Sequence, residues 1–153
     1  MTYDQHCATA AAFARAGRLE EWVHAYLRTD GHNEAFSDGL RLFPRHYIGP
    51  IKMPLRMFAR CCGPEEHMKF RIDRDGFEAR VNGIADAIRV GADLPPLIVH
   101  YADGGFELSD GNHRHEACMR LGLAEFPVII WITEDTELAD FRKKYAAYLS
   151  EID

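Results

Sequence analysis

The sequence has no long hydrophobic run and no segment that resembles a targeting signal. Its longest apolar run, Phe126–Ile132, has seven residues, whereas a membrane-spanning helix needs about 20. The first residues lack the basic-then-apolar order of a signal peptide. We therefore expect a cytoplasmic protein with no membrane partner.

Positive charge is also scarce. Lysine and arginine number 18 against 24 aspartates and glutamates, so the net charge is −6. Nucleic-acid binding draws much of its affinity from neutralised phosphates, and an acidic chain is poorly suited to it. A local basic patch would still permit such binding. Nucleic acid therefore remains a possible but disfavoured partner.

Cysteine is sparse and lacks the spacing of a metal site. The four cysteines are Cys7, Cys61, Cys62 and Cys118, with no CxxC pair, which argues against structural zinc. Adjacent cysteines such as Cys61 and Cys62 rarely bond to each other because the geometry is unfavourable. We expect reduced thiols.

The pattern that is present fits one globular domain with a helical N-terminal extension. The chain has 153 residues, 47% of them hydrophobic. Residues 1–47 carry helical spacing, in an alanine-rich segment from Ala8 to Ala16 and an amphipathic one from Leu19 to Leu27. The main domain is then 48–153. The sequence leaves the role of the extension and the oligomeric state open.

Strand and helix patterns alternate irregularly after residue 48, which predicts an α+β fold. We expect strands at Ile51–Leu55, with Pro54 suggesting a sheet edge, and at Phe126–Ile132. A hairpin joins Leu97–Tyr101 to Phe106–Leu108. The predicted helices lie at 77–88, at 116–122 and near the C-terminus, where Leu138, Phe141, Tyr145, Tyr148 and Leu149 share one face.

The polar turn between the hairpin and the next helix is the main functional candidate. A helix N-terminus presents free backbone N–H groups to an anion. Gly111 lets a ligand approach the backbone, and Asn112 lies within this turn. His113 offers a hydrogen bond or a proton, and Arg114 a fork for phosphate oxygens. Asp110, which phosphate would repel, suits Mg²⁺ or a substrate proton.

Each of these residues also has a structural interpretation. Asp110 is a common turn or helix-capping residue. Arg114 can form an ion pair with Glu116 or another acid, and His113 can serve as a structural hydrogen bonder. We expect His115 to point away from the site.

The order of these segments resembles the ParB/sulfiredoxin superfamily. The resemblance covers roughly residues 48–133 and rests on three stretches, GADLPPLIVHY, GGFELSDGNHRHEACMRLGL and FPVIIWI. It implies a small mixed sheet flanked by helices and a site at the polar turn.

The branches of this superfamily differ at the turn. Partition ParB proteins carry a GERR-like sequence that binds CTP, followed by DNA-binding helices that have no counterpart here. Sulfiredoxins carry a nucleophilic cysteine where this chain has Asn112. We therefore exclude sulfinic acid reduction by that mechanism, since Cys61 and Cys62 lie in another segment. Free-serine kinases read DGHHR, one residue from 110–114, and this branch is the nearest resemblance.

The kinase resemblance implies a catalytic glutamate soon after the first strand, and Glu65 and Glu66 lie there. A solvated first turn of a helix is their structural alternative. The expected function is a nucleotide-dependent phosphotransferase or hydrolase that uses ATP, ADP or CTP with Mg²⁺ and a small hydroxyl-bearing substrate. The alternatives are a nucleotide-binding switch without phosphotransfer and a DNA-binding or nuclease protein.

Overall fold

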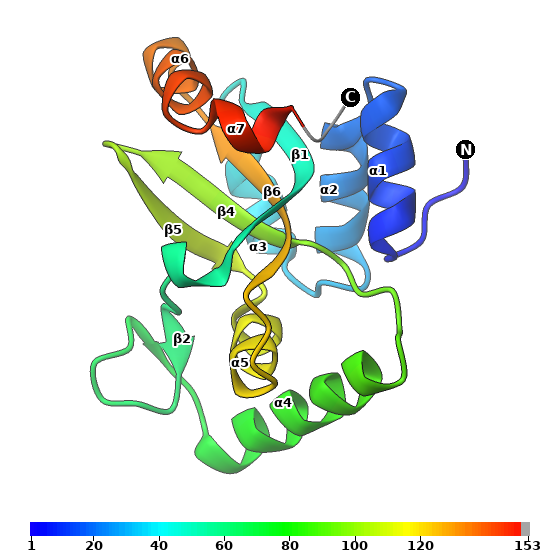
Figure 1. Cartoon of the computed structure of the whole chain (residues 1–153), viewed down its shortest axis with the longest axis vertical. Coiled ribbons are helices and arrows are strands. Elements are labelled where there is room, and N and C mark those ends of the chain that lie inside the picture. The colour runs from blue at the N-terminus through cyan, green and yellow to red at the C-terminus, as the bar shows by residue number, and fades with distance from the viewer. Residues whose placement is uncertain (151–153) are drawn as a thin grey trace.

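The computed structural model describes residues 1–150, so the last three residues of the predicted main domain lie outside the described part. A four-stranded sheet in the order β1-β6-β4-β5 forms its centre (Figure 1). The strands are β1 (His46–Pro54), β6 (Glu125–Ile132), β4 (Leu97–Ala102) and β5 (Gly105–Asp110). The two central strands, β6 and β4, run parallel, and both outer pairs are antiparallel. The expected α+β class with a small mixed sheet is confirmed.

The strands of the main sheet follow the predicted segments but are longer, β5 reaching Asp110 instead of Leu108 and β1 differing most. β6 contains the longest apolar run and is paired on both sides, as a buried central strand should be. β1 is an edge strand, as Pro54 indicated, but it begins at His46 rather than at Ile51. A bulge between Ile48 and Ile51 separates its two halves. Because the bulge interrupts the regular alternation of side chains, the sequence pattern did not predict the first half of the strand.

Alternate residues of the central strands face two separate cores, because successive side chains of a strand point to opposite faces. Leu97, Val99 and Tyr101 of β4 pack on one face. α6 (Asp135–Lys144) and α7 (Ala146–Leu149) cover this face and replace the single C-terminal helix that we predicted. The described residues contain no helix with the length and apolar character needed to cross a membrane.

The N-terminal helices cover the other face. They are α1 (Cys7–Arg15), α2 (Leu19–Arg28) and α3 (Glu34–Leu40). Their core merges with the sheet through Ile98 of β4 and Ile129 of β6. In Figure 1 these helices (blue) and the C-terminal helices (orange to red) lie on different sides of the sheet.

Two helices near the end of the sheet create the surroundings of the polar turn. α4 (Arg74–Arg89) packs against α5 (Asn112–Arg120), with Phe77, Val81 and Ala117 buried between them (Figure 1). The segment between β1 and α4 holds η1 (Leu55–Met57) and two short parallel strands, β2 (Cys62–Gly63) and β3 (Phe70–Arg71).

The boundary of α5 differs from the prediction. Asn112, His113, Arg114 and His115 form the first helical turn, whereas the sequence placed them in a loop before the helix. β5 reaches Asp110, so Gly111 alone joins strand to helix.

Candidate functional site

Gly111 makes the sharp corner between β5 and α5. Its φ of 104° lies in the left-handed region, where glycine is favoured. A Cβ atom there would lie 2.6 Å from Leu97 Cδ2 and 2.8 Å from Arg114 Nη2. The glycine is therefore needed as much to accommodate the Arg114 side chain as to expose the backbone.

Arg114 is buried below this corner, and neighbouring protein groups occupy its guanidinium fork. Nη1 donates to Tyr26 Oη at 3.0 Å, and Nη2 donates to the Pro96 carbonyl at 2.9 Å. Nη2 also lies 3.3 Å from Asp110 Oδ2. The ion pair that we considered thus forms with Asp110, not with Glu116. Arg114 supplies a fixed positive charge beneath the first turn of α5.

Asn112 ties this corner to a segment fifty residues away. Its Oδ1 accepts hydrogen bonds from the backbone N–H groups of Cys61 at 2.9 Å and Cys62 at 3.1 Å. Both cysteines consequently line the same cavity as the polar turn. The two cysteines lie in another segment of the chain, as predicted, but the fold brings them next to the turn.

A cavity of about 540 Å³ lies at the first turn of α5. No side chain caps this helix, and its first internal bond runs from the His115 N–H to the Gly111 carbonyl. The N–H groups of the preceding residues are thus without partners in the helix. The lining residues come from α2 and the segment that leads into α3, from β2 and β3, from α4 and from the corner between β5 and α5. They are Tyr26, Gly31, Asn33, Ala35, Cys61, Cys62, Phe70, Arg80, Ile84, Ser109, Asp110, Gly111, Asn112, His113 and Arg114.

The ionisable groups of the cavity make it receptive to negative charge. Burial, followed by the positive charges of Arg80, Arg114 and Arg60, lowers the pKa of His113 to about 4. His113 is therefore neutral near pH 7 and offers one N–H donor and one acceptor. Arg80 reaches the cavity from α4, and among residues 1–150 no carboxylate lies within ion-pair distance of it.

The Cys62 thiol of the cavity is a poor nucleophile. Burial and the neighbouring Cys61 raise the pKa of Cys62, so the thiol form prevails near neutral pH. Cys61 Sγ donates to the Leu108 carbonyl at 3.3 Å.

The predicted catalytic glutamates lie outside the lining of this cavity. Glu65 Oε1 accepts a hydrogen bond from Arg60 Nη2 at 2.9 Å, and this bond lowers the pKa of Glu65. Glu66 is exposed. The structure thus gathers residues 110–114 around one cavity and leaves both glutamates beside it. His115 points away, as expected, with Nε2 3.0 Å from the Leu55 carbonyl.

Several lining residues escaped the sequence analysis. Tyr26 was assigned only to the apolar face of a helix, which is also true, because its ring stacks on Trp22. Arg80 carries no local signal, since an arginine on the polar side of an amphipathic helix is common. Both were detectable only once the packing of α2 and α4 was known.

Residues 68–143 match the family model of the ParB N-terminal domain. This match covers 76 of the 153 residues, just under half of the chain. A curated relative is the probable chromosome 2-partitioning protein ParB of Deinococcus radiodurans, 39% identical over 51 residues. The matched stretch covers 33% of this chain and 17% of that protein. The matched segment includes the corner at Gly111 and the helices α4 and α5, but not Tyr26 or Ala35, which also line the cavity.

Three solved structures are also similar. Sulfiredoxin from Arabidopsis thaliana has a TM-score of 0.42 and 26% identity, covering 56% of this chain and 83% of that one. ParB from Caulobacter crescentus, complexed with CTP-γ-S, has a TM-score of 0.42 and 18% identity, covering 66% and 52%. A free serine kinase in complex with AMP has a TM-score of 0.39 and 19% identity, covering 55% and 30%.

Proposed function

We propose that the cavity at the start of α5 binds a nucleotide through its phosphate groups. One observation supports this proposal above the others. The uncapped N-terminus of α5 and the Arg80 side chain line the same cavity, and Arg80 has no carboxylate partner in the described chain. The partial positive charge of the helix end and the guanidinium fork both favour phosphate oxygens.

The remaining lining residues suit the rest of a nucleotide. Phe70, Ile84 and the ring of Tyr26 give the cavity an apolar wall, on which a nucleobase can stack or pack. Arg114 does not contact the ligand, since its guanidinium bonds to Tyr26 and Pro96 and pairs with Asp110, which it holds in place at the cavity. The neutral His113 donates to a phosphate oxygen without needing a proton from solvent.

Asp110 fits a magnesium ion that is shared with the nucleotide. It is the only carboxylate that lines the cavity, and the described residues contain no group of three side chains able to hold a metal by themselves. Mg²⁺ at nucleotide sites commonly uses one or two carboxylates together with phosphate oxygens and water. Asp110 would hold such an ion through the oxygen that does not contact Arg114.

Transfer of a phosphoryl group to a small hydroxyl-bearing substrate is the second candidate. Its candidate base is Glu65, which lies outside the cavity lining but has one carboxylate oxygen, Oε2, without a hydrogen-bond partner among residues 1–150. In that reaction the substrate oxygen attacks the terminal phosphorus, the nucleoside diphosphate leaves, and the glutamate takes the hydroxyl proton. Glu65→Gln and Glu66→Gln, assayed separately for phosphoryl transfer, test the step. Full activity in both variants would eliminate it.

Calorimetric titration with CTP, ATP and ADP in the presence of Mg²⁺ tests nucleotide binding itself. Arg80→Gln should weaken the nucleotide that binds best about tenfold, the value of one charge-assisted contact. Arg89→Gln, on the same helix but outside the cavity, is the matched control and should leave affinity unchanged. Absence of heat with all three nucleotides would refute the proposal, as would equal losses in the two variants. Titration with a DNA duplex at low salt tests the alternative that the protein binds nucleic acid.

A further inference from the structure

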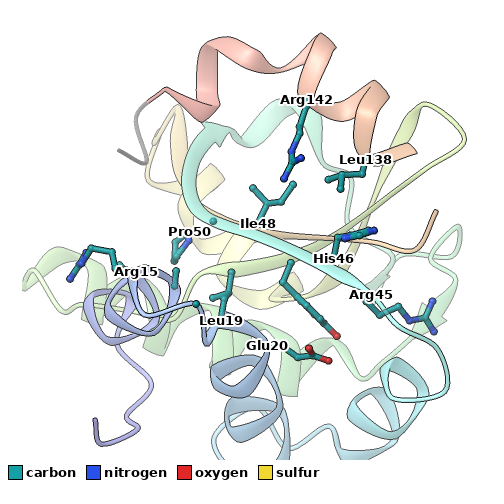
Figure 2. A pocket seen from close by; sticks show the side chains of 14 residues that line it. Arg15, Leu19, Glu20, Arg45, His46, Ile48, Pro50, Leu138 and Arg142 are labelled. Atoms are coloured by element: carbon teal, nitrogen blue, oxygen red, sulfur yellow. The ribbon is translucent and has the colours of Figure 1, made fainter. Parts of the chain in front are cut away.

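A second and larger hollow, of about 1000 Å³, lies along β1 (Figure 2). β1 crosses it between α1 and α2 on one side and α6 on the other. Figure 2 shows Leu19 and Glu20 on one side of the hollow and Leu138 and Arg142 on the other side, with Ile48 between them. We call this hollow the β1 groove. Its lining residues are Ala11, Ala14, Arg15, Gly17, Leu19, Glu20, Arg45, His46, Tyr47, Ile48, Gly49, Pro50, Leu138 and Arg142.

The β1 groove is basic on a protein that is acidic overall. Arg15, Arg45 and Arg142 line it against a single acidic residue, Glu20, while the net charge of the chain is −6. Within residues 1–150, no carboxylate lies within ion-pair distance of any of these three arginines. Such uncompensated charge attracts an anionic partner.

The hydrogen bonds of Arg45 show how one of these cations is fixed. Its nitrogens donate to the Thr133 hydroxyl, the Leu40 carbonyl and the Gly39 carbonyl, all of them uncharged. Its guanidinium also lies 5.1 Å from the centre of the Trp131 ring. The charge of Arg45 is therefore held in place without being neutralised.

The cations are spread along the groove. In Figure 2, Arg15 and Arg45 lie at opposite ends, with Arg142 above the middle of β1. The strand between Arg45 and Pro50 covers roughly 17 Å at about 3.3 Å per residue. A compact anion cannot contact both ends, whereas an extended chain of about six residues can.

The floor of the groove is apolar, and a polar atom without a partner in the described chain is buried beneath it. Ala14, Leu19, Ile48 and Leu138 provide the apolar surface. The hydroxyl of Tyr47 is buried and has no hydrogen-bond partner within the described residues, a condition that proteins usually avoid. Apolar side chains of a ligand would pack on this floor.

We infer that the β1 groove binds an extended acidic segment of another protein, with carboxylates at the arginines and apolar side chains on the floor. We expect the arginine charges to contribute more to this binding than the addition of the bound segment to the sheet as a further strand beside β1. Pro50 has no N–H group, and the bulge after Ile48 breaks the regular edge. Nucleic acid is less suited, since it would bring no aliphatic groups to the apolar floor.

Fluorescence anisotropy with labelled peptides tests this inference on the full chain. The probe is a decapeptide that alternates glutamate with valine, and the matched peptide replaces each glutamate with glutamine. The acidic probe should bind, and the neutral one should bind at least about tenfold more weakly, with a steep loss of affinity at high salt. A ten-nucleotide oligothymidylate provides the nucleic-acid comparison.

Charge reversal locates the contact. Arg15→Glu combined with Arg142→Glu should weaken the acidic probe by about tenfold or more. The control, Arg89→Glu combined with Lys143→Glu, changes the net charge equally at exposed positions outside the groove and should leave affinity within about twofold. The inference is overturned if the acidic probe does not bind at low salt, if both double variants lose affinity equally, or if only the oligothymidylate responds to the Arg15 and Arg142 changes.

Discussion

At the scale of single residues, Gly111 combines two separate constraints, a left-handed backbone and a lack of room for a side chain. Gly111→Ala should lower the free energy of unfolding by about 2–4 kcal/mol, because backbone strain adds to overpacking against Leu97 and Arg114. Gly91 is the matched control. Its φ of 79° is also left-handed, but a Cβ there meets nothing within 4 Å. Gly91→Ala should cost only about 1 kcal/mol in urea unfolding. Equal losses would show that Arg114 does not crowd the corner.

The depressed pKa of His113 predicts a pH dependence of stability. Burial and three nearby arginines lower this pKa from 6.5 to about 4. The unfolded chain therefore binds a proton more readily than the folded one, and stability falls as the pH drops through that window. Since His113 is only partly buried, we expect a loss of about 1 kcal/mol.

Replacing the histidine should remove this loss. Urea unfolding of the wild type and of His113→Gln, at about pH 7 and about pH 4.5, measures the difference between the two conditions. The difference should be smaller in the variant. His67→Gln, at an exposed loop position, should keep the wild-type difference. If His113→Gln loses as much stability at acid pH as the wild type, the titrating group is another one.

At the scale of elements, local pattern predicted the strands well and the start of α5 poorly. Alternation and turn residues identified the β4–β5 hairpin, and an unbroken apolar run identified β6. Polar residues after a glycine indicate a loop, so the sequence pattern places Asn112 through His115 before the helix. Their polarity instead serves buried tertiary bonds, to Cys61, Tyr26 and Leu55. A sequence pattern contains no information about such distant partners.

The Asn112 amide is the link between α5 and the segment that leads to β2. Asn112→Ala should release the Cys61 and Cys62 N–H groups and lower stability by about 1–3 kcal/mol. Hydrogen exchange should then accelerate at those two amides while the β4–β6 pairs stay protected. Asn82→Ala, at an exposed position of α4, is the control and should change neither quantity. Unchanged exchange at Cys61 and Cys62 would contradict the proposed link.

At the scale of the whole molecule, the N-terminal helices are part of the sheet's core and part of the cavity. Trp22 and Leu27 share a core with Ile98 and Ile129, and Tyr26 contacts Arg114. Amphipathic spacing predicted that α2 has a buried face, but spacing does not specify which surface that face covers. The resemblance to the superfamily covers only residues 48–133, so it assigns no role to residues 1–47.

A shared core predicts that residues 1–47 and the sheet unfold together. Calorimetry should show one transition, because the N-terminal helices and the sheet bury each other's apolar surface. Trp22→Ala, in the helices, and Val128→Ala, on the opposite face of β6, should each lower the temperature of that single transition. The tryptophan change should cost about 3–5 kcal/mol, since Trp22 is fully buried. Two resolved transitions, each moved by only one substitution, would instead show that the helices form an independent unit. In that case Tyr26 and Arg114 would not couple the stability of the extension to the cavity.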